Sequence, residues 1–102
     1  MNGLNNLADI LKSYIKDKDI AKKINHHRLF NYWTSIVGAD ISANAKPRLL
    51  RDKVLYISVS NPIWSTELSM MSQEIISKIN TFLNDEVVKE LRIKPDLNQS
   101  FK

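Results

Sequence analysis

The two histidines, His26 and His27, are the side chains best suited to acid–base chemistry or metal binding near neutral pH. They are neighbours in a segment with a helical pattern, where consecutive side chains point about 100° apart, so they cannot hold one metal ion together. No acidic residue or further histidine lies at a spacing that would complete a ligand set. We therefore expect both histidines on the water-facing side of a helix and predict no metal site.

Nucleophiles and phosphate-binding loops are missing from the sequence. There is no cysteine, which excludes disulfides and thiolate metal sites, and no serine lies in a G-x-S-x-G motif. Two glycines in the whole chain exclude a Walker loop, a dinucleotide-binding fingerprint and a G-x-x-G loop that clamps a nucleic-acid backbone. We therefore predict that the protein is not an enzyme and has no cofactor and no small-molecule substrate.

The basic residues are unevenly distributed. Residues 12–53 contain ten Lys and Arg against four acidic residues, a local formal charge of +6, whereas the whole chain carries +4 and the remainder therefore −2. Such an asymmetry favours a polyanionic partner. A basic half that serves only solubility is the alternative interpretation.

Two groups of side chains are candidates for contact with nucleic acid. One lies on a predicted helix around Lys22 and Arg28, where it could follow phosphates or simply form the solvated side of an amphipathic helix. The other surrounds Tyr56 on a predicted sheet, where cations and an aromatic ring suit single strands but also occur on ordinary solvated sheets. The full candidate set is Lys22, Lys23, Arg28, Lys46, Arg48, Arg51, Lys53, Tyr56, Arg92 and Lys94.

Helices are predicted before residue 46. Apolar residues repeat every three or four positions over 3–16, which predicts a first helix. After the polar run at 16–19, a second apolar stripe runs from Ile20 to Val37 and predicts a second helix, which Gly38 ends. We expect one or two more helical turns over 39–45, before Pro47 prevents continuation.

Strands are predicted from Pro47 onward. Leu55, Ile57 and Val59 alternate with less apolar residues, so 53–60 reads as a half-buried strand with 47–51 as its partner. Because the turn at 51–53 has no glycine, we expect a slightly longer loop in place of a tight primed turn. A last strand is predicted over 87–94.

A third helix is predicted directly after the hairpin. Asn61 is a good N-cap and Pro62 suits the first helical position. An apolar stripe then runs from Trp64 to Phe82, over about five helical turns. Trp64 leads this stripe, so we expect it to belong to the scaffold, with its ring near the edge of the core where the indole N–H can find a partner or water.

These elements predict an α+β fold of two layers, with the order α-α-β-β-α-β and a three-stranded mixed sheet covered by helices on one face. We expect a single domain, divided into an N-terminal helix (1–18), a main domain (19–94) and a polar tail (95–102). The N-terminus lacks the pattern of a secretory signal, and no apolar stretch approaches the roughly 18 residues of a membrane span. We therefore expect a soluble, cytoplasmic protein without a membrane partner.

Five motifs occur in a fixed order along the sequence: W-x-x-I-V-G at 33–38, A-x-x-x-P at 43–47, L-x-x-x-x-L-x-I-x-V-S at 50–60, W-x-x-E-L at 64–68 and L-N-x-x-x-V-x-x-L-R at 83–92. Together they resemble the DciA family, bacterial proteins that load or assist the replicative helicase. The match covers roughly residues 20–94. Its structural motif residues here are Trp33, Gly38, Pro47, Trp64 and Leu68.

The resemblance implies a KH-like fold, a partnership with the hexameric DnaB-type helicase and affinity for DNA. One departure is the hairpin turn, where family members often carry Asp-Gly and this chain has Asp52-Lys53. The leading hypothesis is therefore a non-enzymatic adaptor in DNA replication that binds the helicase and assists its loading on single-stranded DNA.

Two other functions fit the sequence. One is a stand-alone KH-like module that binds RNA or associates with ribosomes, against which the missing G-x-x-G loop argues. The other is a structural partner protein whose basic half serves only solubility, which predicts no nucleic-acid binding at physiological salt.

Overall fold

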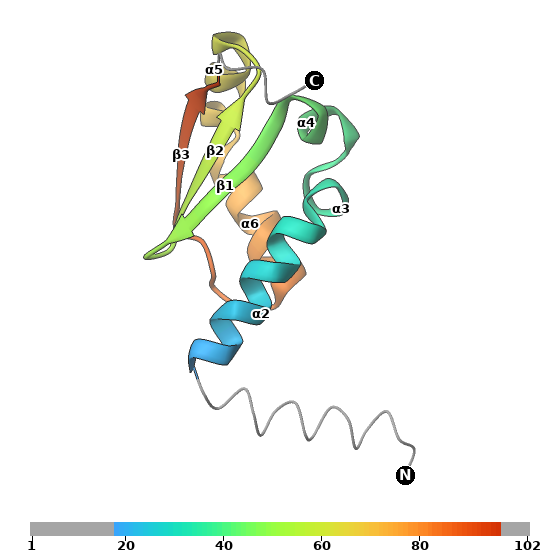
Figure 1. The fold of residues 1–102 in the computed structure, drawn as a ribbon. Coiled ribbons are helices and arrows are strands. Elements are labelled where there is room, and N and C mark those ends of the chain that lie inside the picture. Colours follow the sequence, from blue (N-terminus) through green and yellow to red (C-terminus); the bar gives the residue numbers. More distant parts are fainter. Residues whose placement is uncertain (1–17, 97–102) are drawn as a thin grey trace.

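The computed structural model describes residues 18–96. The helix expected over 3–16 and most of the expected polar tail lie outside these residues. In chain order (Figure 1), the described elements are α2 (Lys18–Asn31), α3 (Trp33–Val37), α4 (Ala39–Asn44), β1 (Ala45–Arg51), β2 (Val54–Val59), α5 (Pro62–Met70), α6 (Ser72–Leu83) and β3 (Glu90–Pro95).

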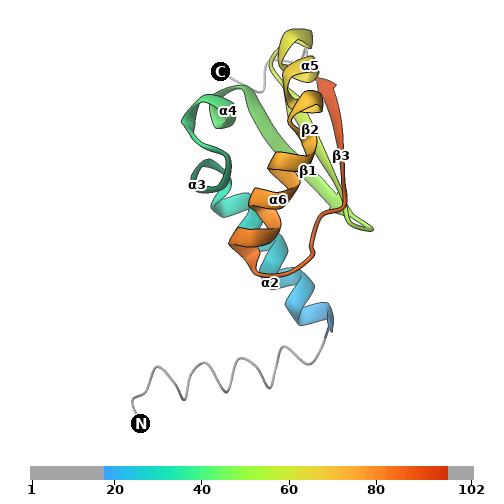
Figure 2. The same cartoon turned by 180° about the vertical axis from the view of Figure 1, so that it is seen from behind.

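The three strands form one mixed sheet in the order β1-β2-β3. β1 and β2 are antiparallel neighbours joined by a hairpin, and β3 runs parallel to β2 after the crossover through α5 and α6. Figure 1 shows the sheet in front of α6, and Figure 2, from behind, shows α5 and α6 in front of the sheet. The predicted α+β class and the mixed three-stranded sheet with helices on one face are confirmed.

The core lies between the sheet and the helices. Leu55, Ile57 and Val59, the inward-facing residues of β2, are fully or almost fully buried, as the alternation in the sequence predicts. They belong to one apolar cluster with Leu68 of α5 and Ile79 of α6. Burying each such side chain contributes about 1.5 to 3 kcal/mol, so this cluster fixes which face of the sheet the helices cover.

The hairpin turn differs from the expected longer loop. Arg51 pairs directly with Val54, so Asp52 and Lys53 form a two-residue turn, and both have positive φ angles, 52° and 66°. A primed turn matches the right-handed twist of the two strands but is unfavourable for residues with a Cβ atom. The neighbouring loop stabilises it, because the backbone N–H groups of Lys89 and Glu90 donate to the Lys53 carbonyl oxygen at 2.8 and 3.2 Å.

Two predicted helices are each divided in the structure. The segment expected to run from Ile20 to Val37 breaks at Tyr32, and the segment expected from Trp64 to Phe82 breaks at Met71. At the second break, the Ser72 hydroxyl donates to the backbone carbonyl oxygens of Leu68 and Ser69. Serine side chains that bond to the preceding turn compete with backbone hydrogen bonds and bend helices, which explains the interruption of an otherwise continuous apolar stripe.

The last strand begins at Glu90, three residues later than predicted, because Asn80 binds the preceding backbone. Its Oδ1 accepts from the N–H groups of Val87 and Val88 at 2.9 and 3.0 Å, and its Nδ2 donates to the Val88 carbonyl oxygen at 2.9 Å. The backbone of these two valines is therefore bonded to α6 and not to β2. Val88 is fully buried, so the segment still contributes to the core.

Gly38 joins α3 to α4 at a φ of 96°. No atom lies close enough to obstruct a Cβ atom at this position, so the requirement for glycine comes from the backbone conformation alone. The short helical segment expected after it is confirmed as α4. None of the helices within residues 18–96 combines the length and apolar character that crossing a bilayer requires.

Candidate nucleic-acid interface

The face of the sheet that points away from the helices gathers most of the predicted contact residues. Side chains alternate between the two faces of a strand, so with Leu50 and Leu55 buried, Leu49 and Tyr56 point outward. The register places Arg92 beside Tyr56, and Lys46 and Lys94 on either side of Ser58. We call this surface the outer face, and it comprises Lys46, Arg48, Leu49, Arg51, Tyr56, Ser58, Arg92 and Lys94.

An irregularity in β1 adds one cation to the outer face. Pro47 pairs with Ile57 and Leu49 pairs with Tyr56, so Arg48 is an extra residue between consecutive positions of β2. Such a bulge interrupts the strict alternation of side chains, and Arg48 and Leu49 are both exposed. In a regular strand, the adjacent residues Arg48 and Leu49 would point to opposite faces.

The centre of the outer face is apolar and partly aromatic. Leu49 and Tyr56 are direct cross-strand partners, with 40% and 37% of their surfaces exposed. An aromatic ring held on an open sheet can stack with an unpaired base, and the aliphatic side chain beside it extends the apolar surface. Leu49 was not among the predicted site residues, because an aliphatic side chain carries no sequence signal for contact with nucleic acid.

Ion pairs occupy some of the cations on this face but not all. Arg48 Nη2 lies 3.3 Å from Asp96 Oδ2, which joins the two edges of the sheet, and Arg92 Nε donates to Glu90 Oε2 at 2.6 Å. Across the part of the chain that the structure describes, no ion pair or hydrogen bond involves the side chains of Lys46, Arg51 or Lys94. These three cations are available to an anionic ligand.

The predicted cations of the second helix do not join the outer face. Arg28 belongs to the join between α2 and α6, since its Nη2 donates to the Phe82 carbonyl oxygen at 3.4 Å and its guanidinium lies 5.3 Å from the centre of the Phe82 ring. This cation–π contact and hydrogen bond give Arg28 a packing role. His27 is exposed, and the His26 ring contacts Phe30.

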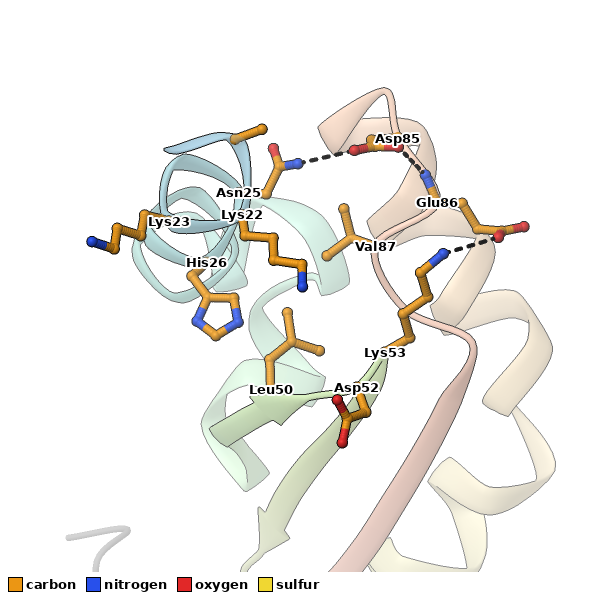
Figure 3. A pocket seen from close by; sticks show the side chains of 11 residues that line it. Lys22, Lys23, Asn25, His26, Leu50, Asp52, Lys53, Asp85, Glu86 and Val87 are labelled. Carbon is orange, nitrogen blue, oxygen red and sulfur yellow. Dashed lines mark hydrogen bonds and ion pairs between the residues drawn. The ribbon is translucent and has the colours of Figure 1, made fainter. Parts of the chain in front are cut away.

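Lys22, Lys23 and Lys53 line a separate groove between α2, the hairpin turn and the loop from α6 to β3. Its volume is about 790 Å³, and Leu50 and Val87 supply apolar surface. Figure 3 shows Lys22 and His26 pointing from α2 into this space, with Lys53 and Glu86 joined on the opposite side. The structure therefore divides the predicted contact residues between two surfaces and the partly buried contact of Arg28 with α6.

Three of the structural motif residues, Trp33, Trp64 and Leu68, pack in or against the core. Trp33 is 4% exposed and its Nε1 donates to the Ala45 carbonyl oxygen at 2.9 Å, while Leu68 is fully buried. Trp64 is partly buried against the core, and its backbone N–H donates to the Asn61 side chain that caps α5. Pro47 lies in β1 opposite Ile57.

Within residues 18–96, no three His, Cys, Asp or Glu side chains lie together as a metal site would require. The outer face and the groove consist of cations, apolar groups and a few carboxylates, a composition suited to binding a charged macromolecule.

Comparison with known proteins identifies relatives over most of the chain. A family described as "Dna[CI] antecedent, DciA" matches residues 6–93. A UPF0232 protein of Rhodococcus jostii is 38% identical over 78 residues, which cover 76% of this chain and 42% of that protein. A UPF0232 protein of Corynebacterium glutamicum is 28% identical over 91% of this chain and 52% of its own length.

A third relative, the UPF0232 protein of Mycolicibacterium paratuberculosis, is 33% identical over 74% of this chain and 45% of its own length. The chain thus spans about half the length of the curated relatives that it matches.

Proposed function

The chain belongs to the DciA family, and from that premise we propose that it is a non-enzymatic adaptor that binds the DnaB-type replicative helicase and helps to place it on single-stranded DNA. Family membership supports the helicase as partner. The observation that supports a nucleic-acid partner is the outer face. There, Lys46, Arg51 and Lys94, which have no ion-pair partner among residues 18–96, surround the exposed Leu49 and Tyr56 pair.

Single-stranded DNA fits this surface better than a duplex does. A single strand presents base faces and phosphates together, so a base can stack on Tyr56 while Lys46, Arg51 or Lys94 contacts the phosphates. Arg92 is in an exposed ion pair, which contributes at most about 1 kcal/mol, so phosphates can compete with Glu90 for it. The outer face is also uncovered by any helix or strand of residues 18–96 (Figure 1).

Complex formation with the helicase tests the first half of the proposal. The chain is mixed with the replicative helicase of the same organism, at physiological salt with nucleotide present, and analysed by size-exclusion chromatography with light scattering. We expect a complex of defined stoichiometry. Separate elution of the two proteins at tens of micromolar would refute the helicase partnership.

Salt dependence of DNA binding tests the second half. In fluorescence anisotropy with a labelled single strand, each phosphate contact contributes about −0.7 to the slope of log affinity against log salt, so three to five contacts predict about −2 to −3.5. A flat response would exclude the outer-face cations as phosphate contacts. Competition with RNA of equal sequence separates the two nucleic-acid functions, because preferred binding of RNA would favour a stand-alone RNA-binding module.

A further inference from the structure

The groove between α2, the hairpin turn and the loop from α6 to β3 has two walls of different charge. On the loop side, Glu86 Oε1 lies 3.5 Å from Lys53 Nζ and 3.7 Å from Lys89 Nζ. Asp85 accepts hydrogen bonds from the Asn25 side chain at 3.3 Å and from the Glu86 backbone N–H at 2.8 Å. Glu86 is thus paired with two ammonium groups, whereas Asp85 is held by neutral hydrogen-bond donors and keeps its charge.

The cations on the wall formed by α2 have no such ion pairs. Among the contacts of residues 18–96, neither Lys22 nor Lys23 has an ion pair or a side-chain hydrogen bond, and the His26 ring lies beside the Phe30 ring. Asp52, at the hairpin turn, is the one groove carboxylate in this region without such a partner. The groove cations without an ion-pair partner in this region, Lys22 and Lys23, therefore both lie on α2.

Between these walls, the groove has an aliphatic floor. Leu50 is 7% exposed, and Ala21 and Val87 are partly buried. A volume of about 790 Å³ is within the usual range of about 300 to 1,000 Å³ for sites that enclose a ligand, so it has room for several side chains. Apolar surface with cations on one side suits the apolar stripe of an amphipathic segment whose charged residues are acidic.

We propose that this groove docks an acidic amphipathic segment of a protein partner, with its carboxylates against Lys22 and Lys23 and an apolar side chain over Leu50 and Val87. The inference rests on the proposed function, in which the partner is the replicative helicase. A nucleic acid is a poorer occupant, because its continuous run of phosphates would also lie against Asp52 and Asp85, whereas a protein segment can present its carboxylates to α2 alone.

Docking in the groove leaves the outer face accessible. Leu50 points to the helix side of β1 and lines the groove, whereas Leu49 points to the other side and belongs to the outer face. The two surfaces therefore lie on different sides of one strand. A protein segment in the groove and a DNA strand on the outer face can bind at the same time.

Thiol protection tests the docking site directly, because the chain has no cysteine and an introduced one is a unique reporter. Ala21→Cys places a thiol in the groove and Ser58→Cys places one on the outer face, and both replaced residues are small and partly buried. We expect saturating helicase to slow maleimide modification of Ala21→Cys severalfold and to leave Ser58→Cys unchanged. A single-stranded oligothymidylate should give the reverse pattern.

Charge reversal supplies matched variants on the two surfaces. Lys22→Glu/Lys23→Glu alters the groove and Lys46→Glu/Lys94→Glu alters the outer face, with the same chemical change and the same change in net charge. The groove variant should lose about tenfold or more in helicase affinity and keep its affinity for single-stranded DNA, whereas the outer-face variant should do the opposite. Thermal unfolding verifies that each variant is folded.

The outcomes separate this inference from the function on which it rests. If the unmodified chain binds the helicase, and the groove variant binds equally well or Ala21→Cys is not protected, the groove is not the docking site and the adaptor function stands. If the unmodified chain does not bind the helicase, the proposed function fails and this inference fails with it. Equal protection of both thiols by helicase would overturn the assignment to separate surfaces.

Discussion

The indole Nε1 of Trp33 donates a hydrogen bond of 2.9 Å to the backbone carbonyl oxygen of Ala45, and both residues are almost completely buried. Trp33 begins α3 and Ala45 begins β1, so this bond ties the helical layer to an edge strand of the sheet. Trp64, the second tryptophan, is only partly buried, and among residues 18–96 no hydrogen bond from its indole is seen. The two tryptophans should therefore respond differently to the same substitution.

We predict that Trp33→Phe lowers the free energy of unfolding by about 2 to 3 kcal/mol, because it removes the hydrogen bond to a buried carbonyl and leaves a small cavity. Trp64→Phe is the matched control and should cost about 1 kcal/mol, since it removes a smaller amount of buried surface and no indole bond. Urea unfolding measures both. An equal cost for the two variants would contradict the assigned difference.

We predict that Lys53→Gly stabilises the protein by about 1 kcal/mol, because glycine adopts the positive φ of the hairpin turn without steric strain. The lost ion pair with Glu86 is exposed and contributes little. Lys53→Ala is the control that loses the same ion pair and keeps the strain, and it should be no more stable than the unmodified chain. Thermal unfolding of the two variants compares them, and a glycine variant no more stable than the alanine variant would refute the strain.

We predict that Asn80→Ala lowers the free energy of unfolding by about 2 to 4 kcal/mol. The amide of Asn80 makes three hydrogen bonds to the backbone of Val87 and Val88, and the substitution leaves these partly buried groups without partners. Asn31→Ala is the control, because Asn31 makes one exposed hydrogen bond to the His27 carbonyl oxygen and should cost under about 0.5 kcal/mol. Urea unfolding measures both, and similar costs would show that the loop is not held by Asn80.

We predict that Tyr56→Ala weakens binding of single-stranded DNA by about 1 to 3 kcal/mol, the usual contribution of one stacked base, with little change in the salt slope. Lys94→Ala should instead reduce the magnitude of the slope by about 0.7, because it removes a phosphate contact. Tyr32→Ala is the control for an exposed tyrosine elsewhere, since Tyr32 packs against Phe82 on the helical layer. Equal losses for Tyr32→Ala and Tyr56→Ala would remove the outer face as the stacking surface.

The strands and the start of α5 could be predicted from the sequence because their signals are local. Alternation from Leu55 to Val59 specifies the buried side of β2, and Asn61 with Pro62 specifies a helix start that the structure shows in the expected form, with the Asn61 side chain accepting from two backbone N–H groups. Each of these signals depends only on residues within a few positions. Distant contacts do not alter them.

The structure differs from the sequence predictions mainly where residues distant in the chain determine the local conformation. The two-residue turn at Asp52 and Lys53 is supported by Lys89 and Glu90, more than thirty positions away, and the late start of β3 depends on Asn80. The break at Met71 is the exception, because it lies at the local hydrogen bonds of Ser72 and the apolar stripe from Trp64 to Phe82 conceals it. The contact of the Arg28 guanidinium with Phe82 also depends on a residue far along the chain. The amphipathic pattern identified Arg28 as basic and helical but could not predict this contact.

The groove is assembled from three stretches of chain, 21–26, 50–53 and 85–87, which meet only when the helical layer and the sheet are both formed. An unfolded chain cannot present this combination, so an occupant of the groove binds the native state alone. Occupancy is then coupled to folding by mass action, and each tenfold excess of ligand over its Kd adds about 1.4 kcal/mol to the stability of the protein. The protein should resist heat and proteolysis more strongly in complex with its partner than alone.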